Sequence, residues 1–391
     1  MPEQLPWLAE QLGGLQDQGL LRDRRQVTPL PDGWCELDGK RLRNFGTNDY
    51  LNLAHDAQLV GVAQSALAEA GVGSRASALV VGRTGWHAHL EEQIARFEKT
   101  QAAILFPSGY AANLGTLAAL ADPGDVIFAD RFNHASLVDG ARLSGARLRV
   151  YRHDNLPKLE SELDKAGSAR RRVIVTDSLF SMDGDLAPLP ELCDLADRYD
   201  ATLVVDEAHA SGVFGEQGRG VGEHWGVEER IPVRIGTLSK ALGTLGGFVA
   251  GSQQLIDWLW NRARTQVFST ALPPALCAAA CAALEIVEQE PQRRTDLFGT
   301  SAHFRDCLRS EKIEFHPTSV GPIVPIILDT PGRAVEASRQ LQERGFLVPA
   351  IRPPTVPRRT SRLRISLSCA HTREDVEQLA SALAETLNRS L

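Results

Sequence analysis

A single lysine stands in the run GTLSKALGTLGG, residues 236–247, among neighbours that could make its amine reactive. Lys240 is the only charged residue between Arg234 and Asp257. Small and apolar neighbours would remove water from the ammonium group and lower its pKa, because burial disfavours the charged form. A neutral amine can condense with an aldehyde to give a Schiff base. Taken alone, the run is more typical of a surface lysine on a glycine-rich loop.

Two other stretches place polar groups directly after apolar runs that resemble buried strands. In VVDEAHASG (204–212), two acids and a histidine follow such a run: Asp206, Glu207 and His209. Open α/β sheets bind ligands at the carboxyl ends of their strands, so this stretch is a candidate site, although a solvated loop is an equal alternative. In RFNHASLVDG (131–140), His134 follows the run VIFAD, and the simpler interpretation is a residue that only begins a helix.

A fourth stretch, PSGYAANLG (107–115), follows the apolar run AILF. When a strand is followed by a Ser-Gly turn and then by a helix, backbone N–H groups are exposed at the start of the helix. These groups can bind an anion. A tight turn between a strand and a helix needs a glycine for other reasons too, so this signal is weak alone.

Together the four stretches indicate one cofactor. Pyridoxal 5′-phosphate needs an anion cradle for its phosphate, a carboxylate that keeps its ring nitrogen protonated, and a lysine for its aldehyde. The cradle, Asp206 and Lys240 occur in that order, and the 34 residues from Asp206 to Lys240 suffice for one strand–helix–strand excursion.

The elements that must position these residues form a regular pattern. Seven short apolar runs alternate with helix-length segments, namely 103–106, 126–130, 148–151, 172–177, 202–207, 233–236 and 247–251. Such runs are typical of a mostly parallel sheet that is buried on both faces. The pattern predicts a large α/β domain over residues 50–275.

Smaller elements are expected on either side of this domain. Residues 1–49 form an N-terminal segment in which leucines at helical spacing predict a helix over 3–21. Residues 276–391 predict a smaller α+β domain, with a long helix over 276–290 and strands at 322–328 and 362–368. Thr372, with Asp375 three residues later, predicts the start of a final amphipathic helix.

Composition excludes several classes of protein. The 391 residues carry a net charge of −7, so no overall basic field would hold nucleic acid. The letters DEAH also occur in nucleic-acid-dependent ATPases, but the phosphate loop GxxxxGK[ST] that those enzymes need is absent from the sequence. Six scattered cysteines form no CxxC pair, so no metal site is expected and a reducing cytoplasm fits. We expect neither a signal peptide nor a membrane span.

A set of longer motifs makes the prediction more specific. The chain resembles the α-oxoamine synthases, which are pyridoxal-phosphate enzymes of the aspartate-aminotransferase fold (fold type I). The resemblance runs from about residue 20 to the end, through NDYLNL, PSGYAAN, NHASL, FSMDGD, VDEAHASGVFGEQGRG, GTLSKALG and AIRPPTVPRRTSRLRISLS. Within the family, AIRPPTVP resembles the branch that acts in biotin synthesis. That branch condenses L-alanine with a pimeloyl thioester and releases CO2 and a thiol.

Carried over residue by residue, the resemblance implies roles around the cofactor ring. Lys240 would hold the cofactor aldehyde, and the amine that it frees would take the Cα proton of the amino acid. Asp206 would pair with the ring nitrogen. His134 would stack on the ring face and donate a proton, while His209 and Ser181 would lie near the phenolic oxygen.

Other positions would hold the phosphate and the substrates. The resemblance gives the phosphate the amides of Gly109 and Tyr110 and the hydroxyl of Thr237. It gives the substrates Arg22, Arg352 and Thr355, and it makes Arg364 a candidate for the amino-acid carboxylate, because a bidentate fork suits that group.

One stretch departs from the family pattern. The glycine-rich segment GSRASALVVG (73–82) has Val81 where the family has a hydroxyl residue that can touch the phosphate from a neighbouring subunit. The family implies a homodimer with a shared site. Three alternatives stay open: coenzyme A or acyl carrier protein as the acyl carrier, a sister synthase that uses glycine or serine, and an aminotransferase of the same fold.

Overall fold

The computed structural model describes residue 5 and residues 7–388, and by contact these residues divide into two compact units. The central unit comprises Asn48–Ser181 and Asp185–Asp296. The terminal unit comprises the described residues of Met1–Thr47 and Leu297–Leu391, together with Met182–Gly184. Sequence analysis placed the boundaries at 49/50 and 275/276. In the structure, the helix after residue 275 packs on helices of the central unit, so that unit extends to residue 296.

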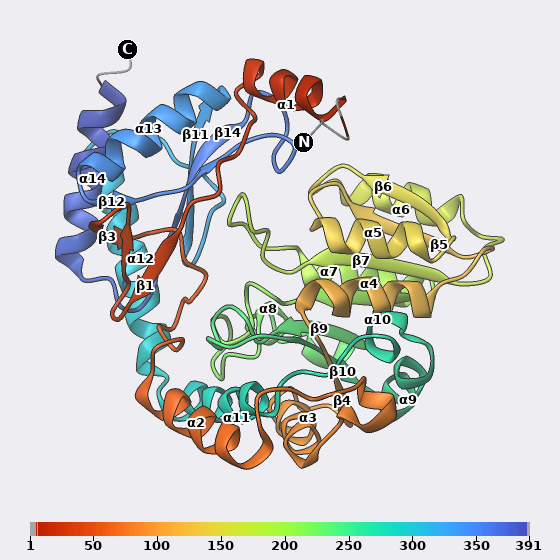
Figure 1. Cartoon of the computed structure of the whole chain (residues 1–391). Coiled ribbons are helices and arrows are strands. Elements are labelled where there is room, and N and C mark those ends of the chain that lie inside the picture. Colours follow the sequence, from red (N-terminus) through yellow and green to blue (C-terminus); the bar gives the residue numbers. More distant parts are fainter. Residues whose placement is uncertain (1–4, 6, 389–391) are drawn as a thin grey trace. The chain divides into compact units, whose positions relative to one another are not determined.

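The central unit is built on a seven-stranded sheet in the order β4-β10-β9-β8-β7-β5-β6 (Figure 1). Strands β5 to β9 run parallel, whereas β10 is antiparallel to both β9 and β4. All seven predicted strands are present: β4 (Ala102–Phe106), β5 (Val126–Asp130), β6 (Arg147–Tyr151), β7 (Arg172–Asp177), β8 (Ala201–Asp206), β9 (Val233–Thr237) and β10 (Gly247–Gly251). The prediction of a mostly parallel sheet within fold type I is confirmed.

Helices cover the sheet because its strands are apolar on both faces. Val204 of β8 belongs to one core cluster, which also takes side chains from α4 (Gly109–Leu120), α5 (Ala135–Leu143) and α9 (Gln253–Arg262). Leu203 and Val205, which alternate with Val204 along the strand, are buried as well. The helix α7 (Leu189–Arg198) packs on β8, and α6 (Leu156–Asp164) lies beside α7.

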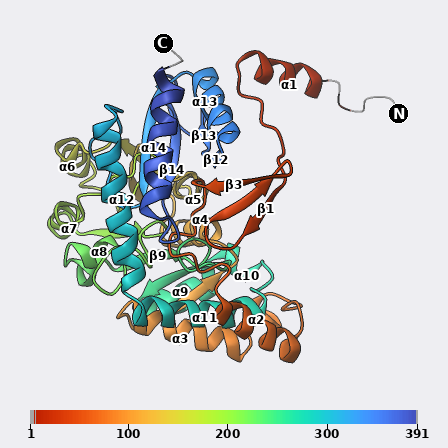
Figure 2. The same cartoon turned by 90° about the vertical axis from the view of Figure 1, so that its left-hand side faces the viewer.

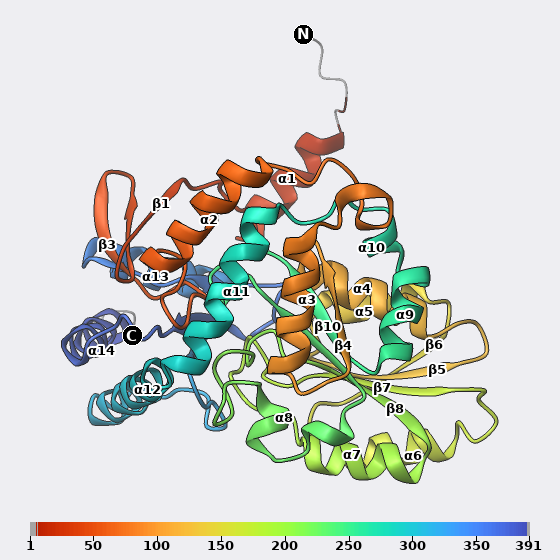
Figure 3. The same ribbon diagram turned by 90° about the horizontal axis from the view of Figure 1, so that it is seen from below.

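Three further helices of the central unit lie side by side (Figure 3). They are α2 (Ala57–Ala70), α3 (Gly85–Phe97) and α11 (Pro274–Gln289). The last of these confirms the predicted helix over 276–290. Shorter helical segments complete the unit: η1 (Ala78–Gly82), α8 (Val221–His224), η2 (Glu228–Arg230) and α10 (Arg264–Val267).

The terminal unit contains two small sheets. One has the order β1-β2-β3-β12, with β1 (Val27–Leu30), β2 (Trp34–Leu37), β3 (Lys40–Asn44) and β12 (Phe346–Leu347), and β12 pairs parallel to β3. The other has the order β11-β14-β13, with β11 (Ile323–Asp329), β13 (Ala350–Ile351) and β14 (Ser361–Ser366). The strands predicted at 322–328 and 362–368 are β11 and β14.

Four helices belong to the terminal unit: α1 (Trp7–Asp17), α12 (Gln292–Ser310), which begins in the central unit, α13 (Pro331–Glu343) and α14 (Arg373–Asn388). Figure 2 shows α12 and α14 close together, and His303 of α12 pairs with Glu377 of α14 at 2.7 Å. The predicted start of α14 is confirmed, because Thr372 Oγ1 accepts a hydrogen bond from Asp375 N at 3.2 Å.

The helix that was predicted over 3–21 corresponds to α1, which is shorter, and positions 3, 4 and 6 of the prediction lie outside the described residues. Among the described helices, none has the length and apolar character needed to cross a membrane.

Candidate active site

Five strands of the central unit end in or just before polar residues, and their carboxyl ends share one edge of the sheet. This includes β4, because β10 is antiparallel to both β4 and β9 and so leaves these two strands parallel. Strands β5, β7, β8 and β9 end at Asp130, Asp177, Asp206 and Thr237, while β4 leads through Pro107 to Ser108. Edges of this kind are where open α/β sheets bind ligands. Every residue that the sequence predicted to bind the cofactor belongs to the central unit.

Asp206 is buried at the end of β8 and is held by two donors. Asn113 Nδ2 of α4 donates to Asp206 Oδ2 at 2.6 Å, and the backbone N–H of Ala208 donates to Oδ1 at 2.8 Å. Asn113 Nδ2 also lies 2.9 Å from Ser136 Oγ on α5. These bonds to the charged form stabilise a carboxylate in a place that burial alone would disfavour.

His134 is the N-cap of α5 and is fixed from two sides. Its Nδ1 lies 2.6 Å from Ser136 Oγ, and its backbone N–H donates to Asp177 Oδ2 at 2.8 Å. Loss of hydration lowers the pKa of His134; the negative charge of Asp206 opposes this shift, and the positive charge of Lys240 adds to it. The charges of Asp206 and Lys240 thus both act on the ring of His134.

Asp177, which was not among the predicted site residues, is buried at the end of β7. In the pairing of β7 with β8, Asp177 stands opposite Asp206. Burial raises the pKa of Asp177 well above its usual value, and the negative charge of Asp206 raises it further. The sequence does contain a signal for Asp177, because the apolar run RVIVTD ends in an acid, as does the run that contains Asp206.

Lys240 is half-buried on a turn that follows β9. The turn is closed by backbone bonds from Gly243 N to Lys240 O at 2.9 Å and from Leu238 N to Gly246 O at 3.0 Å. Gly243 has a φ of +66°, and a Cβ there would lie 2.6 Å from the backbone nitrogen of Ala54. Only glycine can therefore occupy position 243 of this turn without strain. The closed turn keeps Lys240 at the edge of the sheet.

The start of α4 and the end of β9 make a small cradle. Ser108 caps α4 by accepting from Ala111 N at 3.1 Å, and the first N–H groups of a helix have no acceptor within it. A Cβ on Gly109 would lie 3.2 Å from Thr237 Oγ1, so only glycine leaves that space open. Thr237 Oγ1 itself lies 2.8 Å from Ser239 Oγ and 2.9 Å from Gly246 O. Such a cradle suits a phosphate.

The remaining predicted cofactor residues border the same edge. His209 is buried three residues after the end of β8, and its Nδ1 lies 2.8 Å from the hydroxyl of Tyr50 in the NDYLNL motif. Ser181 is half-buried in the loop after β7. The exposed side chain of Tyr110 donates its hydroxyl to Asp139, and its ring meets that of His134 edge-on at 6.2 Å.

The predicted substrate residues all belong to the terminal unit. Arg22 Nη2 donates to Pro353 O at 3.4 Å, and Arg352 Nη1 donates to Gly19 O at 2.7 Å, so these two arginines occupy adjoining segments. Thr355 is exposed in the same loop as Arg352. Arg364 is buried on β14, where its Nη1 donates to Ser366 Oγ at 2.7 Å.

Val81, the position that departs from the family pattern, lies in η1. Its side chain is 71% exposed, and those of Leu79 and Val80 are exposed as well. These three residues form an apolar surface on the central unit.

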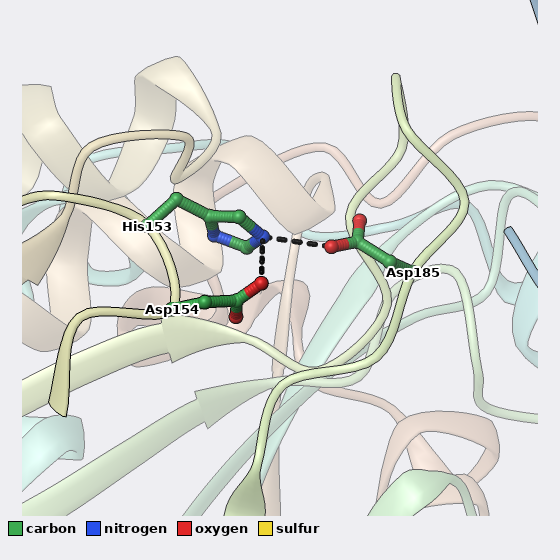
Figure 4. Close-up of side chains that lie close together, drawn as sticks. All are labelled: His153, Asp154 and Asp185. Atoms are coloured by element: carbon green, nitrogen blue, oxygen red, sulfur yellow. Dashed lines mark hydrogen bonds and ion pairs between the residues drawn. The ribbon is translucent and has the colours of Figure 1, made fainter. Parts of the chain in front are cut away.

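Figure 4 shows a histidine with two carboxylates at a spacing that could hold a metal ion. His153 Nε2 lies 2.7 Å from Asp185 Oδ2 and 3.4 Å from Asp154 Oδ2, and Nδ1 lies 3.0 Å from Asp130 Oδ2. Burial alone would lower the pKa of His153, but the hydrogen bonds and charges of Asp130 and Asp185 raise it to about 10. In the structure the cluster is an ion-pair network of His153 with three carboxylates.

The sequence matches the family model "Aminotransferase class I and II" over residues 40–383. It is 47% identical to an 8-amino-7-oxononanoate synthase of Anaeromyxobacter dehalogenans, over 98% of this chain and 96% of that protein. It is 48% identical to the 8-amino-7-oxononanoate synthase of Methylococcus capsulatus, over 97% of this chain and 98% of that one.

Several solved structures have the same fold over most of this chain. Serine palmitoyltransferase of Sphingomonas wittichii superposes with a TM-score of 0.93 at 31% identity, covering 99% of both chains. A high-resolution structure of SPT with PLP as internal aldimine superposes with a TM-score of 0.94 at 28% identity, again over 99% of both. The 8-amino-7-oxononanoate synthase of Francisella tularensis gives 0.78 at 29% identity, over 89% of this chain and 98% of that one.

Proposed function

The chain belongs to the 8-amino-7-oxononanoate synthase family within the class I and II aminotransferases, and we propose that it condenses L-alanine with a pimeloyl thioester. The products would be 8-amino-7-oxononanoate, CO2 and a free thiol, with one proton taken up. The observation that carries the proposal is the grouping of Asp206, His134 and Lys240 at one sheet edge, in a chain that matches these relatives over nearly its whole length.

The protein is a pyridoxal-phosphate-dependent transferase, and its residues fit that cofactor. The space beside Gly109 and the first turn of α4 suit the phosphate, with Thr237 closing the cradle. The buried carboxylate of Asp206 suits a protonated ring nitrogen, and the amine of Lys240 suits the aldehyde carbon. Ser181 and His209 would contact the phenolic oxygen.

When bound, the cofactor supplies an electron sink for the electron pair that Cα gains when it loses a proton or a carboxylate. Lys240 takes the Cα proton of alanine and later returns one to the product. Asn113 and Ala208 donate hydrogen bonds to the carboxylate of Asp206, which would pair with the protonated ring nitrogen. The Cα–acyl carbon bond forms as the carbon–sulfur bond breaks, and the Cα–carboxylate bond then breaks to release CO2.

His134 is the proposed proton donor to the oxygen of the thioester carbonyl. Its lowered pKa makes the protonated ring a stronger acid than an ordinary histidine. Ser136 at Nδ1 and the anchored backbone N–H fix the position of its ring. We assign Arg22, Arg352, Thr355 and Arg364 to the substrates, with Arg364 at the amino-acid carboxylate.

The test of this proposal is a thiol-release assay with pimeloyl thioester and L-alanine. The wild-type protein should release thiol and CO2 in equal amounts, and Lys240→Ala should release neither. Borohydride reduction followed by mass spectrometry should place a pyridoxyl group on Lys240 in the wild type only. Turnover by Lys240→Ala, or a pyridoxyl group on another lysine, would contradict the assignment.

A sister synthase is the second candidate, because serine palmitoyltransferase structures superpose with the higher TM-scores. Serine, glycine and alanine offered in parallel with the same thioester separate the candidates. An aminotransferase would instead convert a keto acid to an amino acid without releasing thiol.

The proposal also includes a homodimer with a shared site, and the exposed apolar surface of η1 supports this part. It further includes action in the cytoplasm.

A further inference from the structure

We propose that His153 is a positioning residue whose ring ties together the two turns that present His134 and Ser181. The importance of those two side chains rests on the proposed function. One turn follows β5: Asp130 Oδ1 accepts from Phe132 N at 2.8 Å, and Asp130 O accepts from Asn133 N at 3.2 Å, just before His134.

The second turn follows β7 and carries Ser181. It is closed by a backbone bond from Phe180 N to Asp185 O at 3.0 Å. Because His153 Nδ1 binds Asp130 and Nε2 binds Asp185, one ring reaches the carboxylates of both turns. Figure 4 shows the Nε2 side of this arrangement.

Aromatic rings hold the histidine in place. Phe132 of the first turn lies 4.9 Å from the His153 ring, and Phe180 of the second turn meets it edge-on at 4.5 Å. Each turn thus contributes both an acid and an aromatic ring. Because both acids need an N–H donor, only the protonated ring satisfies them together. A neutral side chain would leave one buried carboxylate without its partner, which destabilises that turn.

The test compares His153→Gln with His303→Gln. Both changes remove a histidine that pairs with carboxylates: His153 pairs with three in the central unit, and His303 pairs with Glu377 in the terminal unit. We expect His153→Gln to change the visible circular dichroism of the bound cofactor and to lower kcat about ten- to a hundredfold, since small displacements of positioned groups cost that much. His303→Gln should change only the melting temperature.

A double-mutant cycle with Asp185→Asn checks that His153 acts through the second turn. Residues of one network are non-additive, so the double variant should lose little more kcat than His153→Gln alone. An unchanged cofactor spectrum and kcat in His153→Gln, with a lower melting temperature, would overturn the proposal. If His153→Gln fails to fold, Asp185→Asn alone carries the same spectral test.

A separate observation concerns surface charge. Six arginines stand in two adjoining segments of the terminal unit, in a protein whose net charge is −7. We call this set the arginine surface, and its members are Arg22, Arg24, Arg25, Arg352, Arg358 and Arg359. Within the described residues, the exposed side chains of Arg24, Arg358 and Arg359 have no hydrogen-bond or ion-pair partner. Arg25 lies 3.8 Å from Asp38, and elsewhere in the unit Arg309, Arg333 and Arg339 pair with acids.

We infer that the arginine surface docks an acidic carrier protein that bears the acyl thioester. The inference rests on the proposed function, because the surface includes Arg22 and Arg352, which we assign to the substrates. The three unpaired arginines carry like charges on adjoining loops and repel one another, and a partner of opposite charge relieves that repulsion. The charges are exposed and spread over two loops, which suits a protein surface better than a single small anion.

The experiment measures KM for one acyl group on three thiols: acyl carrier protein, coenzyme A and N-acetylcysteamine. Arg358→Glu/Arg359→Glu should raise KM for the carrier-protein donor about tenfold and leave the other two unchanged, because only a docked protein meets the surface. The matched control is Arg142→Glu/Arg147→Glu, two exposed arginines of the central unit.

An equal rise in KM for coenzyme A would assign the surface to the nucleotide phosphates and overturn the inference. An unchanged KM for the carrier-protein donor would overturn it too. A wild-type protein that releases thiol from none of the three donors would instead contradict the proposed function.

Discussion

Two buried carboxylates stand side by side where β7 and β8 end, and they have different partners. Asp206 receives two hydrogen bonds from Asn113 and Ala208, whereas Asp177 receives one from the backbone of His134. Burial raises the pKa of Asp177 well above its usual value, and the negative charge of Asp206 raises it further. Asp206, whose two oxygens each accept a hydrogen bond, is the carboxylate that the proposed chemistry needs to be ionised.

Replacing Asp206 by Asn should therefore separate binding from chemistry. The variant keeps the shape of the site but loses the charge that stabilises a protonated ring nitrogen. We expect cofactor to bind, while exchange of the Cα proton of L-alanine with deuterium oxide, followed by NMR, falls about a hundredfold or more. Asp194→Asn, on the surface beside Arg230, serves as the control. Unchanged exchange in Asp206→Asn would contradict the role.

His371 of the terminal unit should make stability depend on pH. Burial lowers its pKa to about 3, and the positive charge of Arg43 adds to the shift. An unfolded histidine titrates near pH 6.5, so as pH falls below that value the unfolded state takes up a proton that the folded state refuses. The free energy of unfolding should drop by about 1.4 kcal/mol per pH unit from this group, a loss that ends as pH passes about 3.

Urea unfolding between about pH 4.5 and about pH 7 measures this dependence. His371→Asn should show a smaller pH slope than the wild type, while His303→Asn, at a partly exposed position, should keep the wild-type slope. Equal slopes in the wild type and His371→Asn would contradict the prediction.

At the scale of elements, the start of α4 and the start of β10 approach closely. A Cβ on Gly247 would lie 2.5 Å from Ser108 O and 2.6 Å from Gly109 N. Gly247→Ala should therefore displace the first turn of α4 and raise the Kd for pyridoxal phosphate, measured by absorbance titration of the apoprotein. Gly61→Ala is the control, because its Cβ meets open space on α2. It should leave Kd unchanged and stabilise the helix by up to about 1 kcal/mol. An unchanged Kd in Gly247→Ala would count against the cradle.

The sequence predicted the strands well because each is a short apolar run between helix-length segments, and it predicted the ends of β8 and β9 as sites. It did not predict α12, QRRTDLFGTSAHFRDCLRS, because that helix is largely polar and contains Gly299. Nor did it predict Asp177 or His153, whose importance comes from neighbours distant in the chain. The pairing of β12 with β3 joins residues about 300 positions apart, which no local pattern encodes.

At the scale of the whole molecule, the residues assigned to the cofactor lie in the central unit and those assigned to the substrates lie in the terminal unit. Cofactor should therefore stabilise the central unit directly. In scanning calorimetry, a hundredfold excess of pyridoxal phosphate over its Kd should stabilise that unit by about 2.7 kcal/mol. Lys240→Ala should show a smaller gain at the same concentration, and an equal gain would argue against a covalent role for Lys240.

The terminal unit draws on both ends of the described chain, and this has a consequence for biosynthesis. A ribosome makes β1, β2 and β3 before the central unit, yet β3 has no neighbour on its far side until β12 is made some three hundred residues later. The central unit, contiguous apart from one three-residue excursion, can mature in the meantime. The nascent strands β1, β2 and β3 thus present an open strand edge until β12 has been made and closes it.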